Sequence, residues 1–229
     1  METVHKTKII AFEGIDGSGK SLQYRRLTEA LRQRGYCVDC MDFPAYDDFF
    51  GKEIGRMLSG SETVTADTVD AKSMSLWYAL DRLQAFRHYD LTKSDFLLLN
   101  RSSLSNAVYQ STRCPEPERR AMIQWIDCLE FEQLAIPKPD LYIVFDILPE
   151  QSKENVAKKG HREYIGEKAD VYEAKVGFME AVRSAYLVAA EIFDNVEIMN
   201  CMAPEGGMLS VDVIGNRVLQ LAENLRSVH

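Results

Sequence analysis

Residues with the spacing of a phosphate-binding loop lie near the start of the chain. Residues 14–21 read Gly-Ile-Asp-Gly-Ser-Gly-Lys-Ser, which matches the pattern G-x-x-x-x-G-K-[ST]. Such glycines let successive backbone N–H groups turn inward, and the N-terminus of a following helix adds a positive dipole. Lys20 is then expected to reach the β- and γ-phosphates of a nucleotide, and the Ser21 hydroxyl to hold Mg²⁺. The other expected cradle residues are Gly14, Gly17, Ser18 and Gly19.

The surroundings of this loop favour a phosphate site over a plain glycine turn, because an apolar run precedes it and an amphipathic stretch follows it. GTPases, ATPases and small-molecule kinases all carry such a loop. Residues 92–95, Thr-Lys-Ser-Asp, imitate a guanine-reading signal, but they precede an apolar run instead of following one. A kinase for a small substrate is therefore the leading hypothesis.

Alternating strands and helices must position the loop. Short apolar or alternating runs predict strands at 8–12, 36–41, 96–99, 141–146 and 196–199. Helical spacing predicts helices at 21–34, 51–58, 67–89, 103–111, 118–134, 149–168 (with a charged loop), 170–192 and 211–225. Buried strands that alternate with helices indicate a parallel sheet in a three-layer α/β/α sandwich, with ligands at the carboxyl ends of the strands. We expect one domain over 1–229.

Composition narrows the class of protein further. The 229 residues carry 27 Lys and Arg against 35 Asp and Glu, a net charge of −8, and 46% of them are hydrophobic. An acidic chain argues against a nucleic-acid polymer as partner, and no apolar run approaches the roughly 20 residues that cross a bilayer. The cysteine count, five, is odd, which is typical of reduced thiols and predicts a cytoplasmic location.

Beyond the loop, nearly the whole chain resembles the thymidylate kinase family. The resemblance rests on Phe12–Ser21, on Asp42–Tyr46 with Gly51, Ile54 and Gly60, on Tyr78–Arg82, on Asn100-Arg101 with Ser105–Gln110, and on Ile136–Leu141 with Asp146 and Pro149-Glu150. It implies a P-loop NTPase fold with a helical lid at about 151–172. It also implies ATP- and Mg²⁺-dependent phosphorylation of thymidine monophosphate (dTMP), and a homodimer.

The same resemblance implies which residues hold the thymine. Tyr78 would stack on the base, where the family usually has Phe, and Phe43 would wall the base pocket. Arg82 would donate to thymine O4, and Asn106 would read the N3 edge. Gln110, at the end of the Ser105–Gln110 segment, is included among the expected substrate-binding residues.

Sugar and phosphate contacts are implied in the same way. Tyr109 would lie under C2′ and disfavour a ribose hydroxyl, with Tyr46 nearer the sugar and phosphate. Asp16 would lie near the 3′-hydroxyl, and Arg101 would clamp the monophosphate or the transferring phosphoryl group. From the lid, the expected contributors are Asp170 and Tyr172 at the sugar and Arg162 at the phosphoryl group. A merely solvated basic loop is the alternative for Arg162.

Asn100 departs from the family pattern, which has Asp at this position. Asn keeps an acceptor oxygen but loses the negative charge that Mg²⁺ prefers. Three interpretations are open: a weaker enzyme, a shifted metal arrangement, or another carboxylate in its place. The alternative functions are a kinase for another nucleotide or for a deoxynucleoside, and a nucleotide-binding paralogue with little catalysis. Phosphoryl transfer depends mainly on positioning and electrostatics, which favours the kinase.

Overall fold

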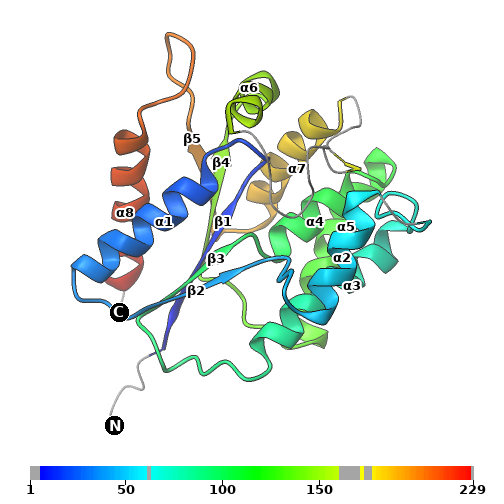
Figure 1. The fold of residues 1–229 in the computed structure, drawn as a ribbon, viewed down its shortest axis with the longest axis horizontal. Coiled ribbons are helices and arrows are strands. Elements are labelled where there is room, and N and C mark those ends of the chain that lie inside the picture. Colours follow the sequence, from blue (N-terminus) through cyan, green and yellow to red (C-terminus); the bar gives the residue numbers. More distant parts are fainter. Residues whose placement is uncertain (1–5, 61–62, 160–170, 173–176, 228–229) are drawn as a thin grey trace.

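A parallel sheet of five strands forms the centre of the computed structural model, which describes residues 6–60, 63–159, 171–172 and 177–227. The strands lie in the order β2-β3-β1-β4-β5 (Figure 1), and each neighbouring pair is parallel. Their bounds are β1 Lys8–Glu13, β2 Val38–Asp42, β3 Phe96–Asn100, β4 Leu141–Asp146 and β5 Val196–Asn200. The predicted parallel sheet is confirmed.

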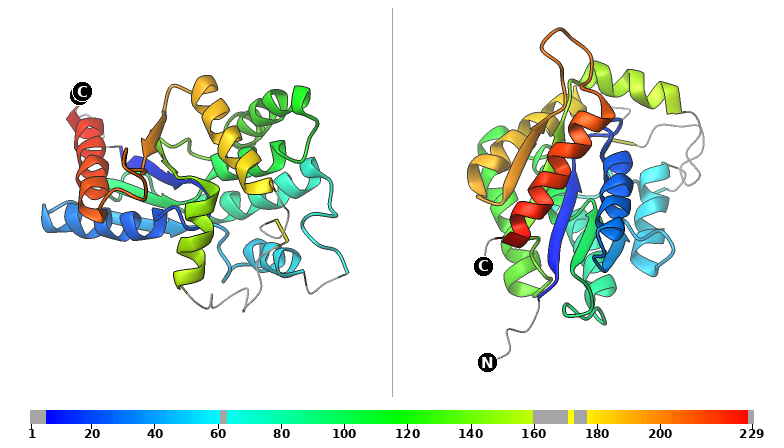
Figure 2. Two further views of the ribbon diagram at one scale, coloured as in Figure 1. Left: turned by 90° about the horizontal axis from the view of Figure 1, so that it is seen from above. Right: turned by 90° about the vertical axis from the view of Figure 1, so that its left-hand side faces the viewer.

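Helices cover both faces of the sheet, as Figures 1 and 2 show. α1 (Lys20–Gln33) packs beside α8 (Val211–Ser227) on one face. The opposite face carries α4 (Ser103–Ser111), α5 (Arg119–Asp127) and α7 (Phe178–Ile192), while α2 (Phe49–Ser59) and α3 (Ala71–Phe86) continue outward from α4. The three-layer α/β/α architecture is therefore confirmed. In the described ranges, no helix has the length and apolar character needed to cross a membrane.

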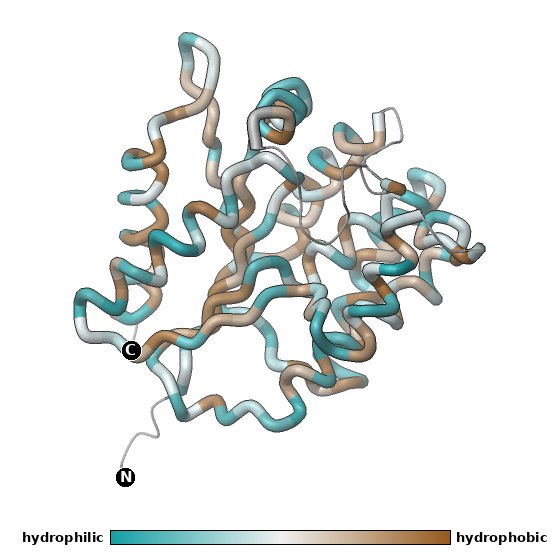
Figure 3. Tube along the Cα trace, viewed as in Figure 1, coloured by the Kyte–Doolittle hydropathy of each residue, from teal (hydrophilic) through white to brown (hydrophobic). Residues whose placement is uncertain are grey.

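The core sits in the central strands. Ile9, Ile10 and Phe12 of β1 and Leu97–Leu99 of β3 are at most 1% exposed, and Figure 3 shows hydrophobic residues concentrated along these strands. Both faces of these strands are covered by helices, which is why their sequences are continuous apolar runs. The edge strands β2 and β5 each have one buried residue, Val38 and Met199, and their other residues are half-buried or exposed.

Three predicted helices have different bounds in the structure. The helix predicted at 67–89 begins only at Ala71, because the Asp70 side chain accepts a hydrogen bond from the Ser73 N–H and caps the helix. The helix predicted at 170–192 begins at Phe178, after Gly177 at a φ of 74°. The span predicted as one helix at 118–134 consists of a 3₁₀ turn, α5 and a π-helix at Cys128–Gln133.

Strand order and register place the ends of three strands together. Asn100 of β3 is paired with Phe12 of β1 on one side and with Asp42 of β2 on the other. The chain leaves β1 toward α1 on one face and leaves β3 toward α4 on the opposite face. A crevice at the carboxyl ends of adjacent strands with such opposed connections is the usual ligand site of α/β folds.

Candidate active site

The glycine-rich loop connects β1 to α1, as predicted from its sequence context. Gly14, Gly17 and Gly19 have φ values of 132°, 76° and 89°, a region that disfavours residues with a Cβ. A Cβ on Gly14 would lie 2.8 Å from the Phe145 carbonyl oxygen, and one on Gly17 would lie 2.6 Å from that of Ser152. Backbone conformation therefore favours glycine at all three positions, and lack of space also requires it at Gly14 and Gly17.

Two cations converge on Asp16 inside this loop. Lys20 Nζ lies 3.1 Å from Asp16 Oδ1, and Arg101 Nη2 lies 2.9 Å from the same oxygen. Burial, and then the charge of Arg101, lower the pKa of Lys20 to about 8. The three residues form a charged cluster at the mouth of the phosphate loop, which can bind anionic phosphoryl groups.

Glu13 was not predicted as a site residue, and it is linked to Arg101 through the Ser105 hydroxyl. Arg101 Nη1 donates to Ser105 Oγ at 3.1 Å, and the Ser105 hydroxyl donates to Glu13 Oε2. The Tyr186 hydroxyl donates to the same oxygen at 3.1 Å. Burial is the largest cause of a raised pKa at Glu13. Arg101 precedes α4 and has a φ of 66°, so helical spacing gave no signal for its contact with Ser105.

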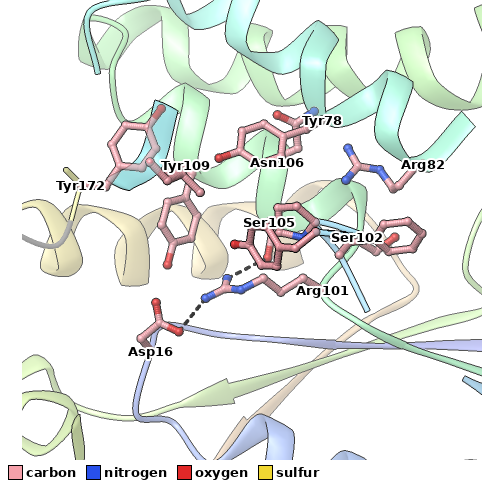
Figure 4. A pocket seen from close by; sticks show the side chains of 13 residues that line it. Asp16, Tyr78, Arg82, Arg101, Ser102, Ser105, Asn106, Tyr109 and Tyr172 are labelled. Carbon is pink, nitrogen blue, oxygen red and sulfur yellow. Dashed lines mark hydrogen bonds and ion pairs between the residues drawn. The ribbon is translucent and has the colours of Figure 1, made fainter. Parts of the chain in front are cut away.

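A cavity opens beside this cluster. Figure 4 shows side chains from the phosphate loop, the β3–α4 turn, α3 and α4 turned toward it. Its lining includes the predicted substrate residues Asp16, Phe43, Tyr46, Tyr78, Arg82, Arg101, Asn106, Tyr109 and Tyr172. Pro44, Leu58, Ser102 and Ser105 complete the lining and were not singled out from sequence. Aromatic rings combined with a few convergent polar side chains are typical of small-molecule sites.

The far end of the cavity is held by a buried ion pair. Arg82 donates from Nε to Glu130 Oε2 at 2.6 Å and from Nη2 to Oε1 at 2.5 Å. Burial works to lower the pKa of Arg82, but the charge and hydrogen bonds of Glu130 keep it above its ordinary value. Asn106 Nδ2 donates to Glu130 Oε1 at 2.9 Å. Arg82 and Asn106 thus share one carboxylate.

Asp81 fixes the wall of the cavity next to this pair. Its carboxylate accepts the Ala45 N–H at 3.1 Å, just after the cis Phe43–Pro44 bond. Burial raises the pKa of Asp81 to about 6. The Phe43 ring also lies 6.0 Å from the Arg82 guanidinium carbon. Asp81 was not predicted from sequence, although it directly precedes Arg82.

Tyr172, the last residue of the expected lid segment, lines the cavity. Its hydroxyl donates to the Ala66 carbonyl at 2.9 Å, and its ring stacks on Phe178 with centroids 5.4 Å apart. Tyr109 packs edge-on against Tyr172 at 6.3 Å, and the Arg101 guanidinium lies 5.4 Å from the Tyr109 centroid. Of these aromatic rings, those of Tyr109 and Tyr172 line the cavity, and Phe178 packs behind Tyr172.

Of the predicted substrate-binding residues that the structure describes, only Gln110 does not line the cavity. Gln110 is fully buried beneath it and accepts a hydrogen bond from Arg113 Nη1 at 2.6 Å. Arg162 and Asp170 lie outside the described residues.

α6 (Pro149–Lys159) lies across the phosphate loop, close to it in Figure 1. The Ser152 hydroxyl donates to the Asp16 carbonyl at 2.6 Å, and Asn155 Nδ2 donates to the Gly17 carbonyl at 2.9 Å. Two carbonyl groups of the loop therefore accept hydrogen bonds from side chains of α6. These two residues lie more than 130 positions after the loop in the chain, so sequence spacing gave no signal for them.

Asn100 is joined to Asp42 at the ends of β3 and β2. Its Nδ2 donates to Asp42 Oδ1 at 2.7 Å, while its buried Oδ1 has no partner among the described residues. Carboxylate, amide and hydroxyl oxygens are ligands that Mg²⁺ accepts. Asp42 and Asn100, with the Ser21 hydroxyl at the start of α1, therefore fit a magnesium ion by chemistry. No cluster of three or more acidic, His or Cys ligands occurs within the described ranges.

Comparisons with known proteins agree with this geometry. The family model for Thymidylate kinase matches residues 12–200. The thymidylate kinase of Mycobacterium tuberculosis (strain ATCC 25618 / H37Rv) is 30% identical over 186 residues, 78% of this chain and 83% of the relative. The probable thymidylate kinase of Thermococcus kodakarensis is 28% identical over 94% of this chain and 97% of its own length.

A solved structure shows the same fold. The thymidylate kinase of Candida albicans superposes with a TM-score of 0.72 at 20% identity, over 96% of this chain and 93% of the other. The family match covers far more than half of the 229 residues. The chain therefore belongs to the thymidylate kinase family.

Proposed function

We propose that this chain transfers the γ-phosphoryl group of ATP to dTMP, giving ADP and thymidine diphosphate. The observation that carries the proposal is the single cavity that joins two kinds of site. At one end Asp16 and Arg101 adjoin the phosphate loop and Lys20. At the other end an aromatic wall surrounds Arg82 and Asn106. Family membership supplies the reaction class.

The transfer is a displacement at phosphorus. An oxygen of the dTMP phosphate attacks the γ-phosphorus of ATP, the bond to the β,γ-bridging oxygen breaks, and ADP leaves with its electrons. Lys20 and Arg101 neutralise charge on the moving group, so the protein needs to supply little beyond positioning. Arg101 is held for this role by Ser105 and by its contact with Asp16.

Magnesium has a matching donor set in this chain. When bound, Mg²⁺ neutralises charge on the phosphate oxygens. Ser21 would hold it from the phosphate loop, and Asp42 would supply the negative charge that Asn100 lacks. The hydrogen bond from Asn100 to Asp42, at 2.7 Å, supports this because it ties the two side chains together at the strand ends. We therefore propose Asp42 as the substitute carboxylate.

Substrate contacts are assigned by proximity to the two ends. Tyr78 and Phe43 would hold the thymine between them, and Tyr109 would lie against the sugar. Tyr46 and Tyr172 would border the sugar and phosphate, since both line the same cavity. Gln110 would act only from behind this lining. Arg162 and Asp170 of the lid remain proposals from the family resemblance.

A substrate panel tests the proposal. ADP release is measured with ATP, Mg²⁺ and each of dTMP, dUMP, dCMP, dGMP, dAMP and thymidine, with Lys20→Ala as the inactive control. We expect dTMP to give the highest kcat/KM. Equal turnover of all the monophosphates would refute the base preference. Tight nucleotide binding without turnover would instead support a nucleotide-binding protein with little catalysis. In that case Asn100→Asp would restore activity if the missing negative charge at this position is the cause.

The chain's assembly and location are part of the same proposal. Leu76, Leu80 and Leu83 share one face of α3, and Leu76 is 42% exposed, which supports the homodimer that the family resemblance implies. Sedimentation at micromolar concentration should show a dimer that Leu76→Glu weakens, while Leu148→Glu, at an exposed position outside this face, leaves it intact. A wild-type monomer would refute the dimer. All five cysteines are free, which supports a cytoplasmic location.

A further inference from the structure

Glu130 lies behind the base end of the cavity without lining it. It is 0% exposed and sits in the π-helix Cys128–Gln133, which follows α5. Wide helical turns of this kind occur often near functional sites. Its carboxylate accepts three N–H groups, from Arg82 Nε, Arg82 Nη2 and Asn106 Nδ2. Each of these donors belongs to a residue that does line the cavity.

These bonds decide which way the Asn106 amide faces. Its Nδ2 group has two hydrogens, and both are used, by Glu130 at 2.9 Å and by the Ser75 carbonyl at 3.0 Å. The Oδ1 atom is left as an acceptor that is buried and has no partner in the described part of the chain. A buried acceptor without a partner is unfavourable. A ligand N–H would satisfy it.

Arg82 is constrained in the same way. Nε and one hydrogen of Nη2 are bonded to Glu130, which leaves the Nη1 group and the second Nη2 hydrogen as donors with no hydrogen-bond partner among the described residues. Figure 4 shows the guanidinium turned toward the space shared with Asn106 and Tyr78. The cavity therefore presents remaining N–H donors of Arg82 beside one acceptor, Asn106 Oδ1.

We propose that Glu130 is the positioning residue that sets base selectivity, an inference that rests on the proposed function. Thymine offers an acceptor at O4 and a donor at N3–H, which complement the donor and acceptor that Glu130 leaves exposed. Cytosine offers a donor at N4 and an acceptor at N3, so both of its groups would meet a group of the same kind. A site with buried polar partners rejects such an analogue strongly.

Glu130→Gln tests this directly. A glutamine has one acceptor oxygen and one donor NH₂, so it cannot accept all three N–H groups, and the Asn106 amide becomes free to turn. We expect kcat/KM for dTMP to fall about 10- to 100-fold, mainly through KM for dTMP. The ratio of kcat/KM for dTMP to that for dCMP should fall as well, while KM for ATP stays within about twofold.

Glu132→Gln is the matched control, because Glu132 is exposed in the same π-helix and its hydrogen-bond partner there is the Cys128 thiol. Glu130→Asp is the conservative variant, because it keeps two carboxylate oxygens that can accept N–H groups. The dTMP-to-dCMP ratio of Glu130→Asp should lie closer to that of the wild type than the ratio of Glu130→Gln does.

Several results would overturn the inference. One is a Glu130→Gln variant that keeps the wild-type dTMP-to-dCMP ratio, and another is a Glu130→Asp variant that loses this ratio as fully as Glu130→Gln. N3-methylated dTMP gives a check on the wild-type chain alone, which holds even if the variants do not fold. We expect it to bind at least tenfold more weakly than dTMP, and equal binding contradicts the role of Asn106 Oδ1. A wild-type chain inactive on dTMP would instead refute the proposed function.

Discussion

Raising the pH from 7 to 9 should weaken ATP binding about tenfold, because Lys20 loses its proton and its positive charge. Lys20 is 6% exposed, and burial, followed by the charge of Arg101, lowers its pKa to about 8. About nine-tenths of the Lys20 side chains are then charged at pH 7, and about one-tenth at pH 9. If ATP binds only the charged form, the apparent affinity follows that fraction.

Titration calorimetry at constant ionic strength and saturating Mg²⁺ measures this dependence. dTMP is the control ligand, because its proposed partner Arg82 has a pKa held above its ordinary value. Asp16→Asn removes a carboxylate that raises the pKa of Lys20, so its loss of ATP affinity should begin at a lower pH. The reasoning is refuted if ATP affinity is flat from pH 7 to 9, or if Asp16→Asn moves the transition upward.

Deprotonation of Lys20 has the opposite effect on folding stability, which it increases. The pKa of Lys20 is about 8 in the folded chain, against 10.5 for a free lysine, so the unfolded chain binds more protons between these values. The contribution of Lys20 to the free energy of unfolding therefore rises with pH across that window. Comparing the unfolding of the ATP-free wild type with that of Lys20→Met isolates the contribution.

Other substitutions have expected outcomes that follow from space and burial. Gly17→Ala should abolish ATP binding with the sheet intact, since its Cβ would lie 2.6 Å from the Ser152 carbonyl oxygen; unchanged affinity in calorimetry would contradict this. Asp42→Asn should raise the Mg²⁺ concentration for half-maximal activity about 10- to 100-fold, and an unchanged Mg²⁺ titration would rule out the substitute carboxylate. Leu98→Ala should lower the free energy of unfolding by about 2–5 kcal/mol in urea, against less than about 0.5 for the exposed Leu148→Ala; equal losses would refute the core assignment.

The fold was largely predictable because its strands are covered on both faces. A run such as Leu97–Leu99 has no polar face, and only a central strand or a buried helix accommodates it. The phosphate loop was predictable because its glycines are local requirements. The start of α3 was also within reach, since Asp70 three residues before Ser73 is a typical N-cap arrangement that the helical spacing outweighed.

The supporting residues of the site could not be predicted, because their partners are distant in sequence. Glu130 meets Arg82 across 48 positions, and Glu13 meets Ser105 across 92. An isolated glutamate in an apolar stretch gives no indication of which cation it will neutralise. The family resemblance identified residues that would touch the substrate, whereas the buried carboxylates that orient them emerge only from tertiary packing.

The hydrogen bonds from α6 to the phosphate loop have a consequence for the thermodynamics of nucleotide capture. Because Ser152 and Asn155 hold the carbonyl groups of Asp16 and Gly17, the peptide units that carry them cannot rotate freely before ATP arrives. The conformational entropy of ordering that backbone is lost during folding instead of during binding. The phosphate loop is therefore already ordered before the nucleotide binds. Removing the hydrogen bonds from Ser152 and Asn155 would lower nucleotide affinity although no contact to the phosphates is removed.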